Sequence, residues 1–297
     1  MKERNLKAQM LVIMAAVLWG TTGSSQAFAP QNATPMAVGA LRMAIGGTAL
    51  LLMAKIRGAF KTKIELDKKL LLTASLCMAV YQPLFFLGVS KTGIAVGTVL
   101  ALGSAPVFSG IIECVFGEKL SSRWVLGTAL SIVGCGLLFG GQDAMNMNVW
   151  GSILSIGAGI SYAIYVKVSK KLFENSPMEP VNGLIFFISA VLLSPILFFQ
   201  DISWLGTTRG IVTMLHLGIV ATAVAYTLFA YALVSISTPK AVALTLVEPL
   251  TAAILGVVVF KERLTGISII GGVLLFCGLI LNSYPEKEKM EDMVIEL

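Results

Sequence analysis

The chain has 297 residues, of which 56% are hydrophobic and 13% are charged, and its formal net charge is +6. A soluble domain has about 25% charged residues, so this chain has too few to cover its own surface with polar groups. The composition therefore indicates an integral membrane protein. The basic residues sit in short gaps between apolar runs, without the interleaved aromatic residues of single-strand binders, so we expect no nucleic-acid partner.

Ten apolar runs are long enough to cross a bilayer as helices, which takes about 20 residues each. In chain order they are 8–29, 35–56, 68–90, 93–115, 122–140, 148–170, 178–200, 209–235, 239–259 and 264–283. The gaps between them are too short to hold a soluble domain. Only the segment 284–297 is plainly polar, and we expect it to be a solvated cytoplasmic tail.

The distribution of lysine and arginine predicts the orientation, because cytoplasmic loops carry an excess of these residues. Of the 22 Lys and Arg residues, Arg42 falls deep inside a span, and the others lie in the gaps or near the ends of spans. With a cytoplasmic N-terminus, the opposite side holds only four, which are Lys91, Arg209, Lys261 and Arg263. The remaining seventeen are cytoplasmic. We therefore expect a multi-pass protein of the plasma membrane with both termini in the cytoplasm.

The second half of the chain repeats the first, 144 positions later. Residues 82–135 match 226–279; for example, Glu118-Lys119-Leu120 reappears as Glu262-Arg263-Leu264. Each half holds five spans, an odd number, so the second copy must enter the membrane upside down relative to the first.

The predicted fold class is thus all-α integral membrane, with ten transmembrane helices arranged as two inverted five-helix repeats. The repeats are residues 8–140 and 148–283. Inverted repeats place a substrate site near the midplane, at the interface between the halves.

Several short motifs carry a family resemblance that covers about residues 8–283. They are Leu18-Trp19-Gly20, Pro35 followed by Arg42, the two runs Gly117-Glu118-Lys119-Leu120 and Lys261-Glu262-Arg263-Leu264, and Leu246-Val247-Glu248-Pro249. In this order the chain resembles the drug/metabolite transporter superfamily, in its ten-helix EamA-type branch. The resemblance implies a transporter of the kind that exports amino acids and other small metabolites. One departure is visible, because the first copy has Ser104-Ala105-Pro106 where the second has Glu248-Pro249.

Two charged residues lie deep inside predicted spans, where a charge is costly. Arg42 is a candidate to bind a substrate carboxylate through its planar fork of donors. Glu248 is a candidate to bind a substrate ammonium group, or to take up the proton that couples transport. Each has a structural alternative: Arg42 can snorkel or tie helix ends together, and Glu248 can hold two helices by a hydrogen bond.

Six further side chains are candidates for substrate binding: Trp19, Gln82, Ser104, Tyr162, Tyr165 and Tyr226. Tyr226 repeats Gln82 at the offset of 144, and Tyr162 falls at the place of Trp19. Together they predict a cavity with aromatic walls and a few polar groups, which suits a small amphipathic solute. The alternative for each is helix packing.

Metal and cofactor chemistry is not predicted. The four cysteines lie inside apolar runs without ligand spacing, and the single histidine, His216, cannot build a metal site alone. We expect His216 to pack or to make a hydrogen bond. The chain has no Walker P-loop, which disfavours direct use of ATP.

The leading hypothesis is an exporter of amino acids or related metabolites that works by alternating access as a monomer in the lipid bilayer, with a small organic solute as its partner. A multidrug or cation exporter that depends on Glu248 is the first alternative. An antiporter of sugar phosphates is the second, although such anions need more buried cations than Arg42. A membrane enzyme is disfavoured, since clustered catalytic groups are lacking.

Overall fold

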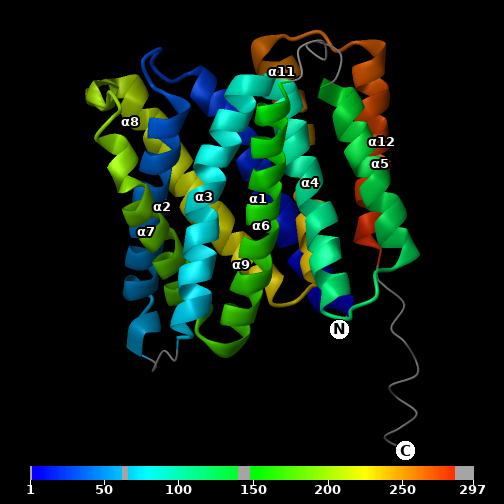
Figure 1. Cartoon of the computed structure of the whole chain (residues 1–297), viewed down its shortest axis with the longest axis horizontal. Coiled ribbons are helices and arrows are strands. Elements are labelled where there is room, and N and C mark those ends of the chain that lie inside the picture. The colour runs from blue at the N-terminus through cyan, green and yellow to red at the C-terminus, as the bar shows by residue number, and fades with distance from the viewer. Residues whose placement is uncertain (1, 62–65, 140–147, 285–297) are drawn as a thin grey trace, which may run out of the picture.

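The computed structural model describes residues 2–61, 66–139 and 148–284, which form one bundle of helices (Figure 1). Some predictions fall outside these ranges. They concern the tail beyond Tyr284, the last residue of the first predicted repeat, and the basic residues Lys63, Lys287 and Lys289.

Ten helical segments are long and apolar enough to cross a membrane, which confirms the predicted class. The uninterrupted ones are α1 (Lys2–Ala27), α2 (Pro35–Ile56), α3 (Lys68–Thr92), α4 (Ile94–Val115), α5 (Ser122–Phe139), α6 (Val149–Asn175), α7 (Met178–Leu197) and α12 (Gly266–Ser283). Short 3-10 turns, η1 (Ala59–Lys61) and η2 (Ser203–Gly206), lie in two of the connections. The described part of the chain contains no strand.

Side-chain caps fix where several helices begin. The Thr34 hydroxyl accepts a hydrogen bond from the Ala37 amide at 3.2 Å, and Pro35 occupies the first helical position of α2. The Asp67 carboxylate accepts from the amides of the first turn of α3. Such caps satisfy amides that a helix leaves unpaired at its N-terminus.

The ninth span was predicted as continuous, but it consists of two helices, α10 (Thr238–Leu244) and α11 (Val247–Phe260). Pro249 explains the interruption, because proline has no amide hydrogen and its ring clashes with the carbonyl four residues earlier, here that of Thr245. The Glu248 amide bonds to this Thr245 carbonyl at 2.9 Å instead. As a result Glu248 lies in the first turn of α11, in the middle of the span.

The eighth span is also interrupted. It runs through α8 (Thr208–Leu215), a π-helical segment η3 (His216–Val224) and α9 (Ala225–Leu233). Inside η3 the Thr222 hydroxyl donates to the carbonyl of Leu217, five residues earlier, at 2.8 Å. Segments of π-helix are rare and frequently mark functional sites.

The arrangement of the helices matches the repeat in the sequence. Helices α2 and α7 pair on one side of the bundle, where α8 also lies, and α5 and α12 pair on the opposite side (Figure 1). Helix α3 packs on α6, and α1 packs on the corresponding span of the second half, η3 with α9. Likewise α4 packs on α6 and α11 on α1. If each helix is replaced by its counterpart in the other half, the α3–α6 and α4–α6 contacts become the contacts of α1 with the eighth span and with α11. The α2–α7 and α5–α12 contacts become themselves, as expected for two related repeats.

The α5–α12 pair shows how closely corresponding helices approach. A Cβ atom added to Gly134 would lie 2.6 Å from the Gly271 carbonyl, and one added to Gly271 would lie 2.7 Å from the Gly134 carbonyl. Further along, Gly127 faces Gly278 in the same way. This pairing makes α5 and α12 antiparallel, which is consistent with inverted repeats. Only glycine permits such backbone contact.

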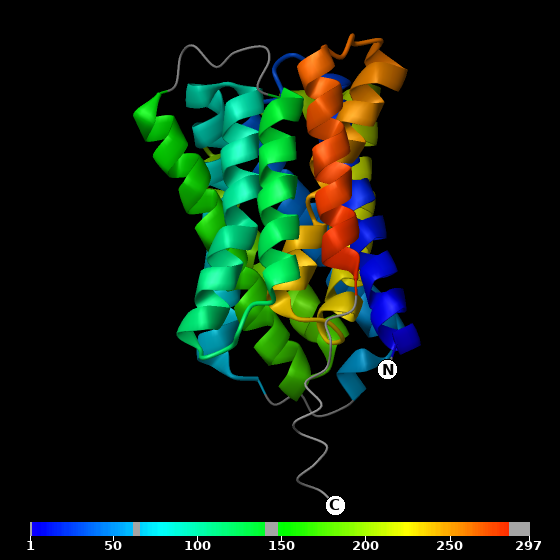
Figure 2. The same ribbon diagram turned by 90° about the vertical axis from the view of Figure 1, so that its right-hand side faces the viewer.

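The beginning of α1 and the end of α12 lie at the same end of the bundle (Figures 1 and 2). Ion pairs join helices at this end: Lys167 Nζ to Glu113 Oε2 at 2.6 Å, and Arg57 Nη1 to Glu179 Oε1 at 2.7 Å. The hydrogen bond and the charge of Glu179 raise the pKa of the exposed Arg57 guanidinium.

The α5–α12 contact leads to a prediction about stability. Gly134→Ala should lower the melting temperature in detergent, because the added methyl group forces two backbones apart, at a cost of about 1–3 kcal/mol. Gly136→Ala is the matched control, because a Cβ atom there meets nothing within 4 Å. Equal melting temperatures for the two variants would contradict the close backbone contact between α5 and α12.

Candidate functional site

A cavity of about 40 Å³ lies inside the bundle, between helices of both halves. A single water molecule needs at least about 10–15 Å³, so a cavity of this size has room for a few water molecules. Its lining is unusually polar for the centre of a membrane protein. It consists of Trp19, Thr22, Arg42, Tyr81, Gln82, Leu102, Ala105, Tyr162, Tyr226, Thr245 and Glu248.

Arg42 reaches the cavity from α2 and is held by η3. Its Nε donates to the Thr222 hydroxyl at 3.2 Å, and its Nη2 donates to the Ala221 carbonyl at 3.3 Å. The close approach of α2 to η3 depends on Gly46, where an added Cβ atom would lie 2.7 Å from Thr222 Cβ. A guanidinium has five donors, so these bonds leave part of its fork available to a ligand.

Glu248 reaches the cavity from the interruption of the ninth span. Its place in the first turn of α11 puts the carboxylate near the positive end of a helix dipole. Helix α1 packs directly on this turn, since a Cβ atom added to Gly20 would lie 2.8 Å from the Glu248 carbonyl. The Glu248 carboxylate is not hydrogen-bonded to any described residue. It also forms no ion pair with Arg42. Both charges therefore remain available inside one cavity.

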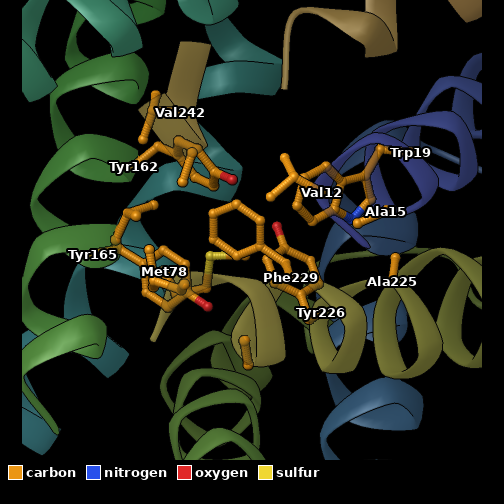
Figure 3. Packing of buried hydrophobic residues seen from close by; sticks show 14 of the residues in the cluster. Val12, Ala15, Trp19, Met78, Tyr162, Tyr165, Ala225, Tyr226, Phe229 and Val242 are labelled. Carbon is orange, nitrogen blue, oxygen red and sulfur yellow. The ribbon is translucent and has the colours of Figure 1, made fainter. Parts of the chain in front are cut away.

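Aromatic rings line the cavity, and those of Trp19, Tyr162 and Tyr226 pack with Phe229 in one buried cluster (Figure 3). The ring of Tyr226 lies 4.8 Å from Trp19 and 4.4 Å from Phe186, measured between centroids. Tyr81 and Tyr162 are 5.8 Å apart. This packing fixes the positions of the rings, so the wall is rigid.

Gln82 and Ser104 differ in their placement. The side chain of Gln82 is buried in the lining, and its Nε2 lies 3.8 Å from the weak acceptor Met43 Sδ. Two predicted site residues, Ser104 and Tyr165, do not line the cavity. Ser104 lies against Gly159 of α6, and its hydroxyl donates to the Ala101 carbonyl at 3.2 Å. The structure therefore brings together Trp19, Arg42, Gln82, Tyr162, Tyr226 and Glu248, but not Ser104 or Tyr165.

Three polar lining residues were not predicted: Thr22, Tyr81 and Thr245. Helical spacing carried a signal for two of them, since Thr22 follows Trp19 by three positions and Thr245 precedes Glu248 by three. Residues at that spacing share a helix face. Tyr81 is adjacent to Gln82, and only the tertiary packing shows that both side chains reach the same cavity.

The histidine and cysteines are placed as their sequence context suggested. His216 Nε2 lies 2.8 Å from the Thr21 hydroxyl, a contact that links η3 to α1. The cysteines of the described chain are free, and the described residues contain no group of three or more potential metal ligands.

A membrane-spanning bundle with two opposite charges facing one central cavity is the architecture of a solute transporter. Residues 6–140 and 149–284 each match the EamA-like transporter family, and the chain belongs to this family. It is 43% identical to YwfM, an uncharacterized transporter of Bacillus subtilis (strain 168), over 94% of this chain and 95% of that protein. The chain is thus a membrane transporter and not an enzyme.

More distant relatives have named activities. The chain is 26% identical to a probable amino-acid metabolite efflux pump of Escherichia coli (strain K12), over 94% of this chain and 95% of the pump. It is 25% identical to the threonine/homoserine exporter RhtA of Salmonella typhimurium (strain LT2), over 92% and 88% of the two chains. A solved crystal structure matches with a TM-score of 0.79 at 18% identity, over 92% of this chain and 95% of that one, which shows a shared fold.

The contact between Arg42 and η3 leads to a second prediction. Thr222→Val should destabilise the protein by about 1–3 kcal/mol in thermal unfolding, because the Arg42 Nε loses its buried acceptor. Thr222→Ser keeps the hydroxyl and should remain near the wild type.

The decisive control repeats Thr222→Val in an Arg42→Ala background, as a double-mutant cycle. The loss should shrink there, since the donor is already gone. An undiminished loss would show that Thr222 acts only through its bond to Leu217 and not by holding Arg42.

Proposed function

We propose that this transporter exports small zwitterionic solutes, amino acids or closely related metabolites, by alternating access. The observation that supports this most is the placement of Arg42 and Glu248 in the lining of one cavity. A guanidinium matches a carboxylate and a carboxylate matches an ammonium group. The activities of two distant relatives, a probable amino-acid metabolite efflux pump and a threonine/homoserine exporter, are in accord with this substrate class and with export.

The proposed mechanism uses the two halves as its moving parts. In this proposal residues 8–140 and 148–283 are the two repeats, and the cavity between them opens to either side of the membrane in turn. The excess of basic residues at the end of the bundle where α1 begins and α12 ends supports a cytoplasmic location of that end. The proposed setting is the plasma membrane, with a monomer as the working unit.

Two other solute classes fit the cavity less well. A sugar phosphate carries at least two negative charges, and Arg42 is the only cationic residue in the lining. A hydrophobic cation would use Glu248 and the aromatic wall but would be repelled by the Arg42 guanidinium. The pairing of both charges in one cavity thus favours a zwitterion over either.

The role of Arg42 predicts a loss of transport without a loss of folding. Arg42→Ala should reduce the uptake of labelled amino acids into proteoliposomes by about tenfold or more, the value of one charge-assisted hydrogen bond. The variant should still elute as a single species in detergent. An unfolded variant would show that Arg42 is structural, and unchanged transport would rule out its role as the carboxylate site.

The role of Glu248 predicts the pH dependence of transport. The other titratable residues in the lining are Arg42 and three tyrosines. If Glu248 exchanges the coupling proton, Glu248→Gln should remove the dependence of transport on pH, because the amide cannot take up a proton. Parallel assays of the wild type and the variant, with and without a pH gradient, measure this. A variant that keeps the wild-type profile would refute coupling through Glu248.

A further inference from the structure

A partly buried ion pair lies between the central cavity and one end of the bundle. Lys167 Nζ, on α6, lies 2.6 Å from Glu113 Oε2, on α4, and the Glu113 side chain is only 8% exposed. Lys167 Nζ also lies 5.3 Å from the centroid of the Phe116 ring, within the range at which a cation is attracted to an aromatic face. The pair thus ties α4 to α6 through a carboxylate that the helices remove from water.

This pair lies toward the end of the bundle where α1 begins and α12 ends, here called the inner end (Figures 1 and 2). Lys167 follows the lining residue Tyr162 by five positions on α6, and Glu113 follows the lining residue Ala105 by eight on α4. At 1.5 Å per residue these separations are about 8 and 12 Å. The buried helix α10 packs on both α4 and α6. The α4–α6 contact therefore closes one wall of the cavity toward the inner end.

The counterpart of this contact in the repeat, between α1 and α11, has no such pair. Glu113 corresponds to Val257 at the offset of 144, and Lys167 corresponds to Ser24, because the first helices of the two halves align at an offset of 143. Neither Ser24 nor Val257 carries a charge. The α4–α6 contact is also the more extensive of the two. The ion pair thus strengthens one of two contacts that the repeat makes equivalent.

A second ion pair at the inner end has a different place in the repeat. Arg57 Nη1 and Glu179 Oε1, 2.7 Å apart, join α2 to α7, which are counterparts of each other. The segments that flank these helices at the outer end are joined as well, since Asn32 Nδ2 donates to Asp201 Oδ2 at 2.8 Å. A contact that is its own counterpart keeps its place when the two halves exchange roles. The Arg57–Glu179 pair therefore has no need to break during transport.

Alternating access places the opposite demand on the α4–α6 contact. In an inverted repeat it exchanges the environments of counterpart contacts, so a contact that is closed in one state is open in the other. An ion pair suits a contact of this kind. When the contact is closed, Lys167 compensates the charge of the Glu113 carboxylate; when it is open, water hydrates both groups. Separation without water would leave a buried charge unpaired, which is costly, so the pair breaks only as water enters from the inner end.

We infer that the Glu113–Lys167 ion pair is a gate that holds the inner side of the cavity closed and breaks in each transport cycle. This rests on the alternating access of the proposed function and is independent of the substrate class. Neither residue lines the cavity, so both are positioning residues for transport. Weakening the pair shifts the population toward the state that is open to the inner end.

The test measures access to the cavity and needs no transported solute. The partly exposed lining residue Thr22 is replaced by cysteine in a protein whose native cysteines are alanine. A membrane-impermeant thiol reagent is then added to membrane vesicles of either orientation. Glu113→Gln should increase labelling from the inner end about tenfold and leave labelling from the outer end no faster, because one state gains population at the expense of the other. Lys167 is 31% exposed and stays hydrated in this variant.

Glu179→Gln is the matched control, because it removes the same group from the Arg57–Glu179 pair. Its labelling from the inner end should stay at the wild-type rate. The inference is overturned by unchanged labelling in Glu113→Gln. It is equally overturned by an increase of the same size in both variants, or from both ends, since general loosening of the bundle would have that effect.

A cross-link provides a second measurement if Glu113→Gln does not fold. Glu113→Cys with Lys167→Cys, joined by a short bifunctional thiol reagent, should stop transport, and reductive release of the reagent should restore it. The same link between Arg57→Cys and Glu179→Cys should leave transport intact. Transport through a cross-linked α4–α6 contact would contradict the gate. If labelling behaves as expected but no amino acid is transported, the proposed substrate class fails and the gate stands.

Discussion

The site depends on the cost of holding two charged groups, the Arg42 guanidinium and the Glu248 carboxylate, inside an apolar bundle. A charge at the centre of a membrane helix costs about 2.5–3.5 kcal/mol on insertion scales, so each must have local compensation. Arg42 obtains it from the Thr222 hydroxyl and the Ala221 carbonyl, which η3 presents. Glu248 lies instead at the N-terminus of α11, near the positive end of its dipole. Both compensations come from irregular backbone in the second half of the chain.

This irregularity separates the two halves, although their sequences repeat. Pro106 lies inside the continuous helix α4, whereas Pro249 lies in the first turn of α11 after an interruption. Likewise α3 is an unbroken helix, while its counterpart in the second half contains η3. Non-helical backbone at membrane depth is tolerated where it is buried or lines a cavity. The second half thus supplies the polar backbone, and the first half supplies Arg42, Gln82 and the indole of Trp19.

The sequence predicted the fold closely, because bilayer thickness sets helix length and the predicted ends fall within a few residues of the observed ones. It also predicted most of the polar cavity lining, since a charged or aromatic residue inside an apolar span is conspicuous. It did not predict η3, whose residues are as apolar as those of a regular helix, or the placement of Ser104 against α6 instead of in the cavity. Both depend on which helix faces meet, and the composition of a single span does not contain that information.

The most direct measurement of the central claim is the binding of one amino acid and two of its derivatives to the purified protein, by calorimetry or thermal stabilisation. The derivatives are the carboxamide, which lacks the carboxylate, and the N-acetyl form, which lacks the ammonium group. If Arg42 and Glu248 take opposite ends of one solute, both derivatives should bind at least about tenfold more weakly than the parent. A carboxamide that binds as tightly as the parent would contradict the account, because Glu248 alone would then select the solute.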